Sequence, residues 1–267
     1  MILTADIGNS SITVGLFDVS EDKPDGELKC KSKYSTDARK SADEYAALIY
    51  NTFNINSVDA SRIEAVMISS VVPQLTDVVK EALSRITDAR VYVVGPGLRT
   101  GVNIRTDDPS ELGSDIVANA VGALSVVKPP FVIVDVGTAT SLFAVDKNRT
   151  IVGGCIAPGL RISLDSLKNS TSQLPAVSLS APKEVIGKNT DSAIRAGLIS
   201  GHAMMIDGMI DAFSRELGES ELGVVITGGL AKSVLPIISH KTVYSEDLTL
   251  EGLFGIYKLN SKKLSAK

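Results

Sequence analysis

The sequence contains no tryptophan, and it has only two cysteines and two histidines among its 267 residues. Cys30 and Cys155 lie far apart and form no Cys-x-x-Cys pair, which argues against a disulfide framework and against a cysteine-rich zinc site. His202 and His240 are equally isolated. We therefore expect these four side chains to be structural or incidental, and we expect the chemistry to come from other residue types.

The sequence also lacks an excess of positive charge and a long uninterrupted apolar run. A net charge of -4 gives no general attraction to nucleic acid or to an anionic membrane, so we expect a small-molecule partner, with no nucleic acid and no membrane. The most apolar long stretch, 116–134, is interrupted by Asn119, Lys128, Pro129 and Pro130, which predicts a helix, a turn and a strand. The first residues show no signal-peptide pattern, so we expect a cytoplasmic protein.

Two segments of the sequence look like copies of one motif. Residues 2–10 read ILTADIGNS and residues 131–140 read FVIVDVGTAT, and each continues into a second alternating stretch. In both copies an Asp ends an apolar strand, Asp6 in the first and Asp135 in the second. A Gly follows two residues later, where the backbone can turn sharply or approach a ligand closely. Each copy therefore predicts a strand, a tight turn and a strand.

Hydroxyl and amide side chains are crowded into both turns. A carboxylate for a metal ion, beside backbone N–H groups and hydroxyl donors, suits a polyphosphate and its Mg²⁺. A single Asp-x-Gly-Asn-Ser segment is typical of an ordinary Asx or hairpin turn. Because the pattern occurs twice, in corresponding places of two halves, it favours a nucleotide site.

The remaining sequence alternates strands and helices. The predicted strands are at 29–35, 63–72 and 91–94, and the predicted helices begin at Ser41 and extend over 75–86, 116–127, 162–169 and 192–217. Residues 21–26 and 100–113 are predicted as turns and loops, and a weak Gly-Gly turn at 227–231 offers another place for a nucleotide. This order predicts two α/β domains of similar plan, at 1–115 and 116–267.

Nine short blocks of the sequence carry a more specific pattern. They are 6–10 (DIGNS), 35–37 with 43–45, 69–73 (SSVVP), 94–97 with 100–101, 111–115 (ELGSD), 135–140 (DVGTAT), 158–159, 186–190 (IGKNT) and 227–231 (TGGLA). In these blocks and their order, over nearly the whole length, the chain resembles the type III pantothenate kinases of the acetate and sugar kinase, Hsc70 and actin superfamily.

The resemblance implies a fold and an activity. The fold would be α/β, with two duplicated ribonuclease H-like (actin-like ATPase) domains and a nucleotide cleft between them. The activity would be ATP-dependent phosphorylation of pantothenate to 4'-phosphopantothenate, the first step of coenzyme A biosynthesis. The resemblance also implies a homodimer that uses ATP, Mg²⁺ and either K⁺ or NH₄⁺.

The resemblance also implies roles on the nucleotide side. Asp6 would hold Mg²⁺ through water, and Asp135 would bind the monovalent cation. Thr138 would contact ATP, while Gly228 and Gly229 would lie near the adenosine. The first phosphate-binding turn would comprise Asp6, Ile7, Gly8, Asn9, Ser10, Ser11, Ile12 and Thr13.

On the acceptor side, the resemblance implies that Gly113, Ser114, Asp115 and Ile116 contact pantothenate, with Asp115 as the proton acceptor. Thr190 would be a substrate contact supplied within the homodimer. Phosphoryl transfer needs a carboxylate that orients the attacking hydroxyl and accepts its proton. From the residues alone, Asp115 has a second interpretation, in which it and Ser114 cap a helix that begins at Ile116.

Two acceptor-side positions depart from the family pattern. The family usually has Arg where this chain has Ile116, and Tyr where it has Thr106. An Arg binds a carboxylate bidentately and Ile cannot, so another basic residue, such as Arg105 or Arg161, would have to hold the acceptor's carboxylate.

Two alternative functions stay open at this point. The protein could phosphorylate another small hydroxy acid, or it could be a non-catalytic nucleotide-binding accessory protein. The three retained carboxylates, Asp6, Asp115 and Asp135, argue against the second alternative, because a protein without catalysis has no need of them in a phosphate site.

Overall fold

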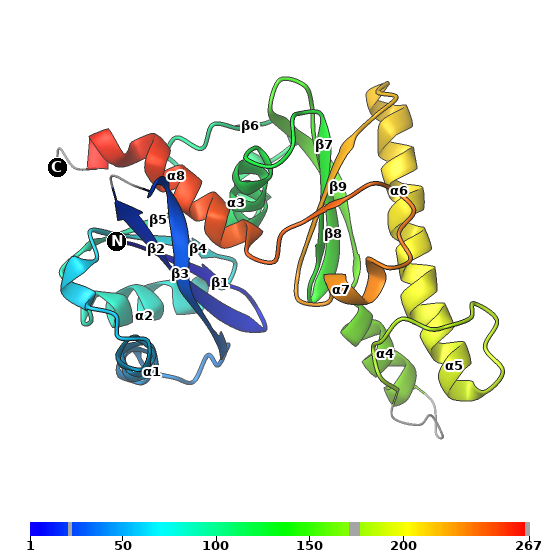
Figure 1. Ribbon diagram of the computed structural model, residues 1–267, viewed down its shortest axis with the longest axis horizontal. Coiled ribbons are helices and arrows are strands. Elements are labelled where there is room, and N and C mark those ends of the chain that lie inside the picture. The colour runs from blue at the N-terminus through cyan, green and yellow to red at the C-terminus, as the bar shows by residue number, and fades with distance from the viewer. Residues whose placement is uncertain (21–22, 171–176, 265–267) are drawn as a thin grey trace. The chain divides into compact units, whose positions relative to one another are not determined.

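The computed structural model describes residues 1–20, 23–170 and 177–264. The chain forms two compact α/β units, each built on its own mixed sheet (Figure 1). Unit 1 comprises Met1–Gly101, Ser110–Gly122 and Leu248–Lys267, and unit 2 comprises Val102–Pro109 and Ala123–Asp247. Each unit is defined by the contacts within it, and each contains residues from both sides of the boundary expected between 115 and 116. The division into domains 1–115 and 116–267 remains a prediction.

The sheet of unit 1 has the strand order β3-β2-β1-β4-β5. An antiparallel meander is formed by β1 (Ile2–Ile7), β2 (Ser11–Ser20) and β3 (Lys23–Ser35), and β4 (Ala65–Ser70) and β5 (Arg90–Val93) extend the sheet in parallel with β1. At the carboxyl end of β1, Asp6 pairs with Thr13 on β2 and with Ser69 on β4. The central strand therefore delivers Asp6 to the edge where two neighbouring strands also present hydroxyl groups.

Strand alternation divides the core of unit 1 between the two faces of its sheet. Leu3, Ala5 and Ile7 of β1 are buried in a cluster with α1 (Ala42–Ile55) and α2 (Pro73–Ser84). The Ser41 hydroxyl caps α1 as expected, and the Glu44 side chain returns a hydrogen bond to the Ser41 backbone. A 3₁₀ turn at Ala60–Arg62 leads into β4.

The other face of this sheet is covered by α8 (Leu248–Leu264), the last helix of the chain. The Phe254 ring stacks on Phe17 of β2 with 4.6 Å between the ring centroids. Thr249 Oγ1 donates to Asn119 Oδ1 of α3 (Ser114–Ala123) at 2.7 Å. These contacts make α8 and α3 part of unit 1, although unit 2 separates them in the sequence.

The sheet of unit 2 has the order β11-β10-β7-β8-β9-β6. Its meander is β7 (Phe131–Val136), β8 (Ala139–Val145) and β9 (Thr150–Pro158), and β10 (Gly223–Thr227) and β11 (Val243–Tyr244) extend the sheet in parallel with β7. Apart from β6 (Asn103–Ile104), which is added beside β9, the order matches unit 1 strand for strand. The predicted duplicated α/β fold of the ribonuclease H-like, actin-like ATPase type is confirmed.

The helices of unit 2 are α4 (Leu160–Asn169), α5 (Thr190–Arg195), α6 (Gly201–Leu217) and α7 (Ala231–Val234). A π-helical segment at Ala196–Ser200 joins α5 directly to α6. Val134 and Leu142 of the sheet are fully buried in one cluster with Ile206 and other side chains of α6. This core fixes the long helix beneath the strands that end at the second turn.

Several elements differ from the sequence-based expectation. The loop expected at 100–113 contains β6 and a 3₁₀ turn at Pro109–Glu111, because two residues of parallel pairing are too short to give a recognisable pattern. Strand β3 already begins at Lys23, within the expected turn at 21–26. The helix expected at 116–127 extends over Ser114–Ala123, and the one expected at 192–217 contains the π segment.

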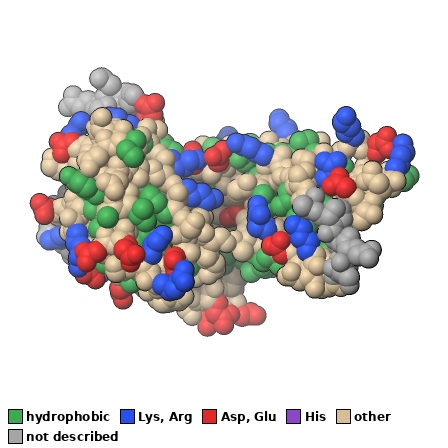
Figure 2. Space-filling view, turned by 90° about the horizontal axis from the view of Figure 1, so that it is seen from below, with side chains coloured by type: hydrophobic (Ala, Val, Ile, Leu, Met, Phe, Trp, Pro, Cys, Tyr) green, Lys and Arg blue, Asp and Glu red, His purple; other side chains and the backbone are tan. Residues whose placement is uncertain are grey.

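Within the described ranges, no helix is both long enough and apolar enough to cross a membrane. On the face drawn in Figure 2, Lys and Arg side chains are interspersed with Asp and Glu side chains. Among the described side chains, this view shows no extended patch of one sign.

Candidate functional site

The first of the two repeated motifs of the sequence forms a tight turn at the carboxyl end of β1. The backbone N–H of Gly8 donates to the Ser11 carbonyl at 3.0 Å. Thr36, just beyond β3, donates its hydroxyl to the Gly8 carbonyl at 2.6 Å and its N–H to the Ser10 carbonyl at 3.2 Å. Asp6 is half-buried, whereas Asn9 and Ser10 are exposed. Thr36 therefore stabilises the turn, while Asn9 and Ser10 remain accessible to solvent.

The start of α3 is attached to the carboxyl end of β4, next to this turn. Ser114 Oγ accepts a hydrogen bond from the Ser70 backbone N–H at 2.9 Å and donates to the Ser70 carbonyl at 3.1 Å. It also lies 3.0 Å from the buried Ser69 hydroxyl. Since Ser69 pairs with Asp6, this network brings the predicted metal-binding and acceptor-binding residues of unit 1 into one neighbourhood.

Asp115 lies within the first turn of α3, and burial raises the pKa of its carboxyl group, although a hydrogen bond from the Ile116 N–H to Oδ1, at 2.8 Å, opposes the shift. Gly113 packs so closely that a Cβ there would collide with Asp115 Oδ1. The Gly113 carbonyl accepts the N–H groups of Ile116 and Val117. The helix therefore starts at Ser114, which differs from the alternative in which Ser114 and Asp115 cap a helix starting at Ile116.

The second motif forms the corresponding turn at the end of β7 in unit 2. Here Val136 pairs with Thr140, whereas Ile7 pairs with Ile12, so the second turn is one residue shorter than the first. The Gly137 N–H donates to the Ala139 carbonyl at 3.0 Å, and the Gly159 N–H donates to the Thr138 carbonyl at 3.2 Å. Both copies are tight turns beside a strand-ending Asp, but they are not identical.

The Gly-Gly turn after β10 packs directly against the second turn. Gly228 has φ +100°, and a Cβ there would press on Asp135 Oδ1 and on the Val136 backbone. The Leu230 N–H donates to the Val136 carbonyl at 3.0 Å. Unit 2 therefore brings Asp135 together with Gly228, while Thr138 and Gly229 are exposed beside them.

The side chains present fit the metal ions that the sequence implies only if water and phosphate oxygens supply most of the metal ligands. Among the described residues, no group of three or more His, Cys, Asp or Glu side chains is arranged to hold a metal ion. Mg²⁺ in phosphate-transferring sites usually keeps several waters and takes one or two carboxylates plus phosphate oxygens. A single carboxylate such as Asp6, at a turn with exposed polar residues, matches that requirement, and Asp135 offers a carboxylate for a second cation.

The remaining acceptor-side residues lie in unit 2. Thr106 follows β6, and its Oγ1 is buried without a hydrogen-bond partner among the described residues. Arg105 is exposed, with Nη2 3.6 Å from Asp146 Oδ2. Arg161 is exposed near the start of α4, and Thr190 is exposed as the first residue of α5. By contrast, Gly113–Ile116 belong to unit 1.

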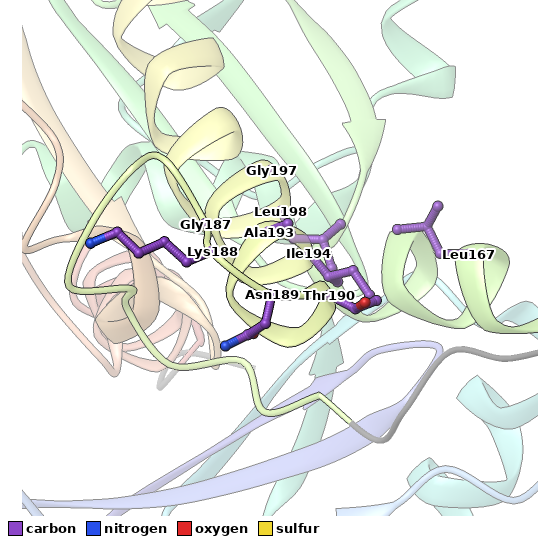
Figure 3. Close-up of a pocket in the computed structure, with 9 residues that line it drawn as sticks. All are labelled: Leu167, Gly187, Lys188, Asn189, Thr190, Ala193, Ile194, Gly197 and Leu198. Carbon is purple, nitrogen blue, oxygen red and sulfur yellow. The ribbon is translucent and has the colours of Figure 1, made fainter.

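Thr190 borders a hollow of about 640 Å³ in the surface of unit 2 (Figure 3). The hollow lies between the end of α4 and the α5–π segment, and it is lined by Leu167, Gly187, Lys188, Asn189, Thr190, Ala193, Ile194, Gly197 and Leu198. Nearby in the sequence, Val185 and Ile186 are 60% and 81% exposed. Sequence reasoning singled out only Thr190 here, because the apolar residues read as ordinary helix positions.

Sequence reasoning also gave no role to Thr36, Ser69 and Ser70, although all three lie in the quoted blocks. Their contacts join segments 28 to 45 residues apart, which no local pattern specifies. The available signal was a pair of hydroxyl residues at the end of an apolar strand, as in the two turns.

A sequence model of the type III pantothenate kinase family matches residues 2–212. The chain belongs to the type III pantothenate kinase family. A relative from Geotalea daltonii (strain DSM 22248 / JCM 15807 / FRC-32), called type III pantothenate kinase, is 38% identical over 261 residues, which cover 97% of this chain and 99% of the relative. The resemblance stated from the nine blocks is confirmed.

Solved structures show the same fold at low sequence identity. A conserved putative Baf family transcriptional activator from Campylobacter jejuni matches with a TM-score of 0.63 at 17% identity, over 97% of this chain and 99% of that chain. A putative 2-dehydro-3-deoxygalactonokinase from Sinorhizobium meliloti matches with a TM-score of 0.57 at 12% identity, over 97% and 98% of the two chains. At these identities the likeness concerns the fold alone.

Proposed function

We propose that this chain transfers the γ-phosphoryl group of ATP to the 4'-hydroxyl of pantothenate, giving 4'-phosphopantothenate for coenzyme A biosynthesis. The observation that carries the proposal is the near full-length match to a curated pantothenate kinase at 38% identity. The geometry is compatible with it, because the half-buried carboxylate of Asp115 follows Ser114, whose hydrogen bonds to Ser69 and Ser70 join it to the strand that pairs with Asp6.

Asp115 acts as the proton acceptor in this proposal. Its carboxylate orients the acceptor hydroxyl and takes its proton as the oxygen bonds to the γ-phosphorus and the bond to ADP breaks. Burial raises the pKa of Asp115, which makes the ionised group a stronger base than an exposed aspartate. The bonds of Ser114 to Ser70 keep the first turn of α3, and with it Asp115, in place.

The nucleotide side uses the turns of both units. The backbone and hydroxyl groups of 8–13 donate to the phosphates, and Asp6 holds Mg²⁺ through water. In unit 2, Thr138 contacts ATP, Gly228 and Gly229 lie near the adenosine, and Asp135 binds K⁺ or NH₄⁺. When bound, the cations neutralise the charge that the phosphates carry during transfer.

The acceptor side is where this chain differs from its family. Ile116 and Thr106 replace an Arg and a Tyr, so the acceptor's carboxylate needs another cation. Arg161 is the better candidate of the two, because Arg105 already lies near Asp146. The same two replacements favour, as a second candidate function, a kinase of another small hydroxy acid.

We also propose that the protein acts in the cytoplasm as a homodimer, with Thr190 contacting the substrate. Exposed apolar side chains beside Thr190, Val185 and Ile186, support a second copy of the chain as the partner of this surface. Their burial in a dimer would remove apolar area from water.

One assay tests the proposed function directly. ADP release by the purified protein is followed with Mg²⁺ and K⁺, in the presence and absence of pantothenate, and Asp115→Asn serves as the matched control. Pantothenate-dependent ADP release by the natural protein, and its loss in Asp115→Asn, is expected. Release that other small hydroxy acids stimulate and pantothenate does not would transfer the proposal to another acceptor. ATP binding without any turnover would favour the accessory-protein alternative.

A further inference from the structure

A buried polar pair, His202 and Thr140, adjoins the phosphate-type turn of unit 2. His202 Nε2, on α6, lies 2.7 Å from Thr140 Oγ1, on β8. The two residues are 9% and 0% exposed, respectively, and their elements contribute Ala203 of α6 and Leu142 of β8 to the buried core of unit 2. Burying two polar side chains in an apolar cluster costs free energy unless they bond to each other, so this pair is a specific feature of the site.

Thr140 occupies the position at which the second turn rejoins the sheet. It pairs with Val136, and the turn between them consists of 137–139. In this turn the Gly137 N–H donates to the Ala139 carbonyl, and the Gly159 N–H donates to the Thr138 carbonyl. The hydrogen bond between Thr140 and His202 anchors one end of the segment that carries Thr138.

The face of the sheet on which Thr140 lies excludes direct contact between His202 and a ligand of Asp135. Cross-strand partners share a face, so Asp135 and its partner Ser141 lie on one side of the sheet. Thr140 is the neighbour of Ser141 and points to the opposite side, toward the α6 core. His202 thus acts on the turn through Thr140.

The π-helical segment sets the direction of His202. Ala196–Ser200 inserts an i→i+5 turn between α5 and α6. One extra residue rotates the following side chains by about 100° relative to an uninterrupted α-helix. Without this extra residue, a helix that continued from α5 would not direct His202 toward Thr140. Burial lowers the pKa of His202, which keeps its ring neutral, and a hydroxyl can bond to either neutral tautomer.

We propose that His202 is a positioning residue for nucleotide binding, which holds the second phosphate-binding turn in its receptive conformation through the hydrogen bond to Thr140. This inference rests on the proposed function, in which that turn contacts ATP. Loss of the bond should therefore weaken the binding of ATP and leave the acceptor site unaffected.

The test compares His202→Phe, His202→Gln and Thr140→Val with the natural protein. Phe keeps a ring without the nitrogen, Gln restores a polar atom, and Val keeps the shape of Thr without its hydroxyl. Calorimetric titration with MgATP, without acceptor, gives the Kd, and steady-state kinetics give KM for ATP and for pantothenate. Ile206→Val, which removes a methyl group from the same buried helix face, controls for a general loss of packing.

We expect His202→Phe and Thr140→Val each to raise the Kd for ATP by about 3- to 10-fold, the range for one hydrogen bond, with KM for pantothenate unchanged. The double variant should be no weaker than either single one, and His202→Gln should recover part of the affinity. Ile206→Val should lower the melting temperature and leave the Kd unchanged.

An unchanged Kd for ATP in Thr140→Val, or equal rises of both KM values, would overturn the inference, and Thr140→Val serves if His202→Phe does not fold. Amide hydrogen exchange over 137–141 in the nucleotide-free protein separates this inference from the proposed function. If the natural protein binds no ATP, the proposed function is rejected. Exchange that is faster in Thr140→Val than in the natural protein and in Ile206→Val would still support the role of His202, and equal exchange would reject it.

Discussion

Ser114 Oγ lies 2.9 Å from the backbone nitrogen of Ser70 and accepts its hydrogen bond. This contact joins the first turn of α3 to the end of β4, and β4 pairs with the strand that ends in Asp6. Ser114, which precedes the proposed base, therefore attaches the helix to the sheet through its side chain. The position of Asp115 therefore depends on the hydroxyl group of Ser114, a residue that the family resemblance also implies as a pantothenate contact.

Ser114→Ala should lower kcat by about 10- to 100-fold, because a small displacement of Asp115 misplaces the proton acceptor. The Ser70 N–H would also lose its partner, so the melting temperature should fall. Steady-state kinetics and thermal unfolding check both effects. Ser84→Ala, which removes an exposed hydroxyl bonded to the Lys80 carbonyl on α2, is the control and should change neither. Full kcat in Ser114→Ala would show that this attachment does not position the base.

Asp115→Asn should fold and bind ATP but retain less than about a tenth of the natural kcat, because only the proton acceptor is removed. The Asn oxygen can still accept the Ile116 N–H. Since the folded pKa of Asp115 lies above that of the unfolded chain, its ionised form opposes folding at neutral pH. The melting temperature should consequently stay the same or rise. A variant with kcat above that limit would remove Asp115 from the role of base.

Activity should require K⁺ or NH₄⁺ in addition to Mg²⁺, because Asp135 offers a carboxylate beside the second turn and a bound monovalent ion adds positive charge near the phosphates. Initial rates are compared in buffers that contain only Na⁺, K⁺ or NH₄⁺ at equal ionic strength. Asp135→Ala should lose the distinction between these ions. Equal rates in Na⁺ and K⁺ buffers would contradict the assignment.

Ile116→Arg should lower KM for pantothenate and leave KM for ATP nearly unchanged. A hydrogen bond to a charged group contributes about 1.5 to 3 kcal/mol, which corresponds to roughly tenfold to 150-fold in binding. Arg161→Ala, measured in parallel, tests whether that residue already supplies the cation in the natural protein, in which case its KM for pantothenate rises. If neither the natural protein nor Ile116→Arg turns over pantothenate while both bind ATP, pantothenate is not the acceptor.

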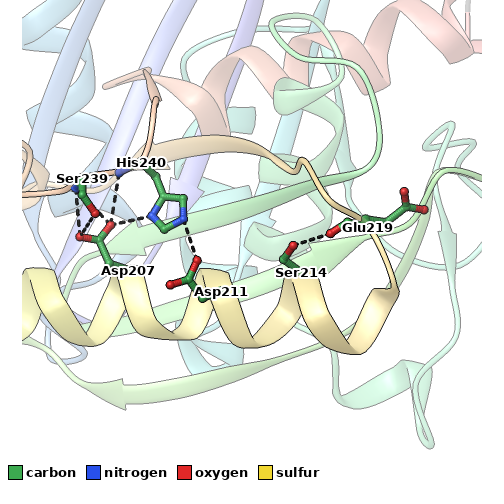
Figure 4. A network of polar contacts seen from close by, with 6 residues as sticks. All are labelled: Asp207, Asp211, Ser214, Glu219, Ser239 and His240. Carbon is green, nitrogen blue, oxygen red and sulfur yellow. Dashed lines mark hydrogen bonds and ion pairs between the residues drawn. The ribbon is translucent and has the colours of Figure 1, made fainter.

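A cluster of polar side chains around His240 in unit 2 predicts how the stability of the protein depends on pH (Figure 4). His240 Nδ1 lies 2.8 Å from Asp207 Oδ1, and Nε2 lies 3.1 Å from Asp211 Oδ1, one helical turn along α6. Ser239 also donates to Asp207 through its N–H and its hydroxyl. Because both ring nitrogens face carboxylate acceptors, only the doubly protonated ring can donate to both.

The hydrogen bond and charge of Asp207, with those of Asp211, raise the pKa of His240 above its ordinary value. Burial favours protonation of Asp207, but hydrogen bonds from His240 and Ser239 outweigh it and lower the pKa of that carboxyl. The contribution of His240 is therefore complete below the pKa of an unfolded histidine, about 6.5, and is lost as the pH rises through the folded value. The contribution of Asp207 is lost only as the pH falls through its lowered pKa.

His240→Gln should accordingly lower the melting temperature more at about pH 5.5 than at a pH above the raised pKa of His240, where the natural ring has lost its second proton. Thermal unfolding of both proteins across this range measures the difference. Asp211→Asn, which removes one of the two facing charges, should reduce the same pH dependence without abolishing it. A difference between natural protein and His240→Gln that stays constant with pH would contradict the charged state of His240.

Local patterns were enough to predict the main course of the fold. The alternation around Asp6 and Asp135 and the capping pair Ser41 and Glu44 are short-range features, and the structure contains them where the sequence indicates. The contacts that join distant segments were not predictable. Ser114 lies 44 residues from Ser70, and His202, which the sequence presents as isolated, lies 62 residues from Thr140.

The end of the chain shows the same limit. Helix α8 was not among the predicted helices, and only the folded protein reveals that it covers the sheet of unit 1, through Phe254 on Phe17. The role of an element in the core depends on which surface is left uncovered by the rest of the chain, and a single sequence does not state that.

The placement of α8 also constrains how the protein can be made. A ribosome synthesises the five strands of unit 1 first, but Leu250 and Phe254, which cover Ile2 and Phe17, emerge only after all of unit 2. Until then, one face of the nascent N-terminal sheet presents apolar side chains to water. Unit 2 can acquire its core during translation, whereas unit 1 has to wait until α8 has been synthesised, so premature termination before 248 should yield a product that depends on chaperones.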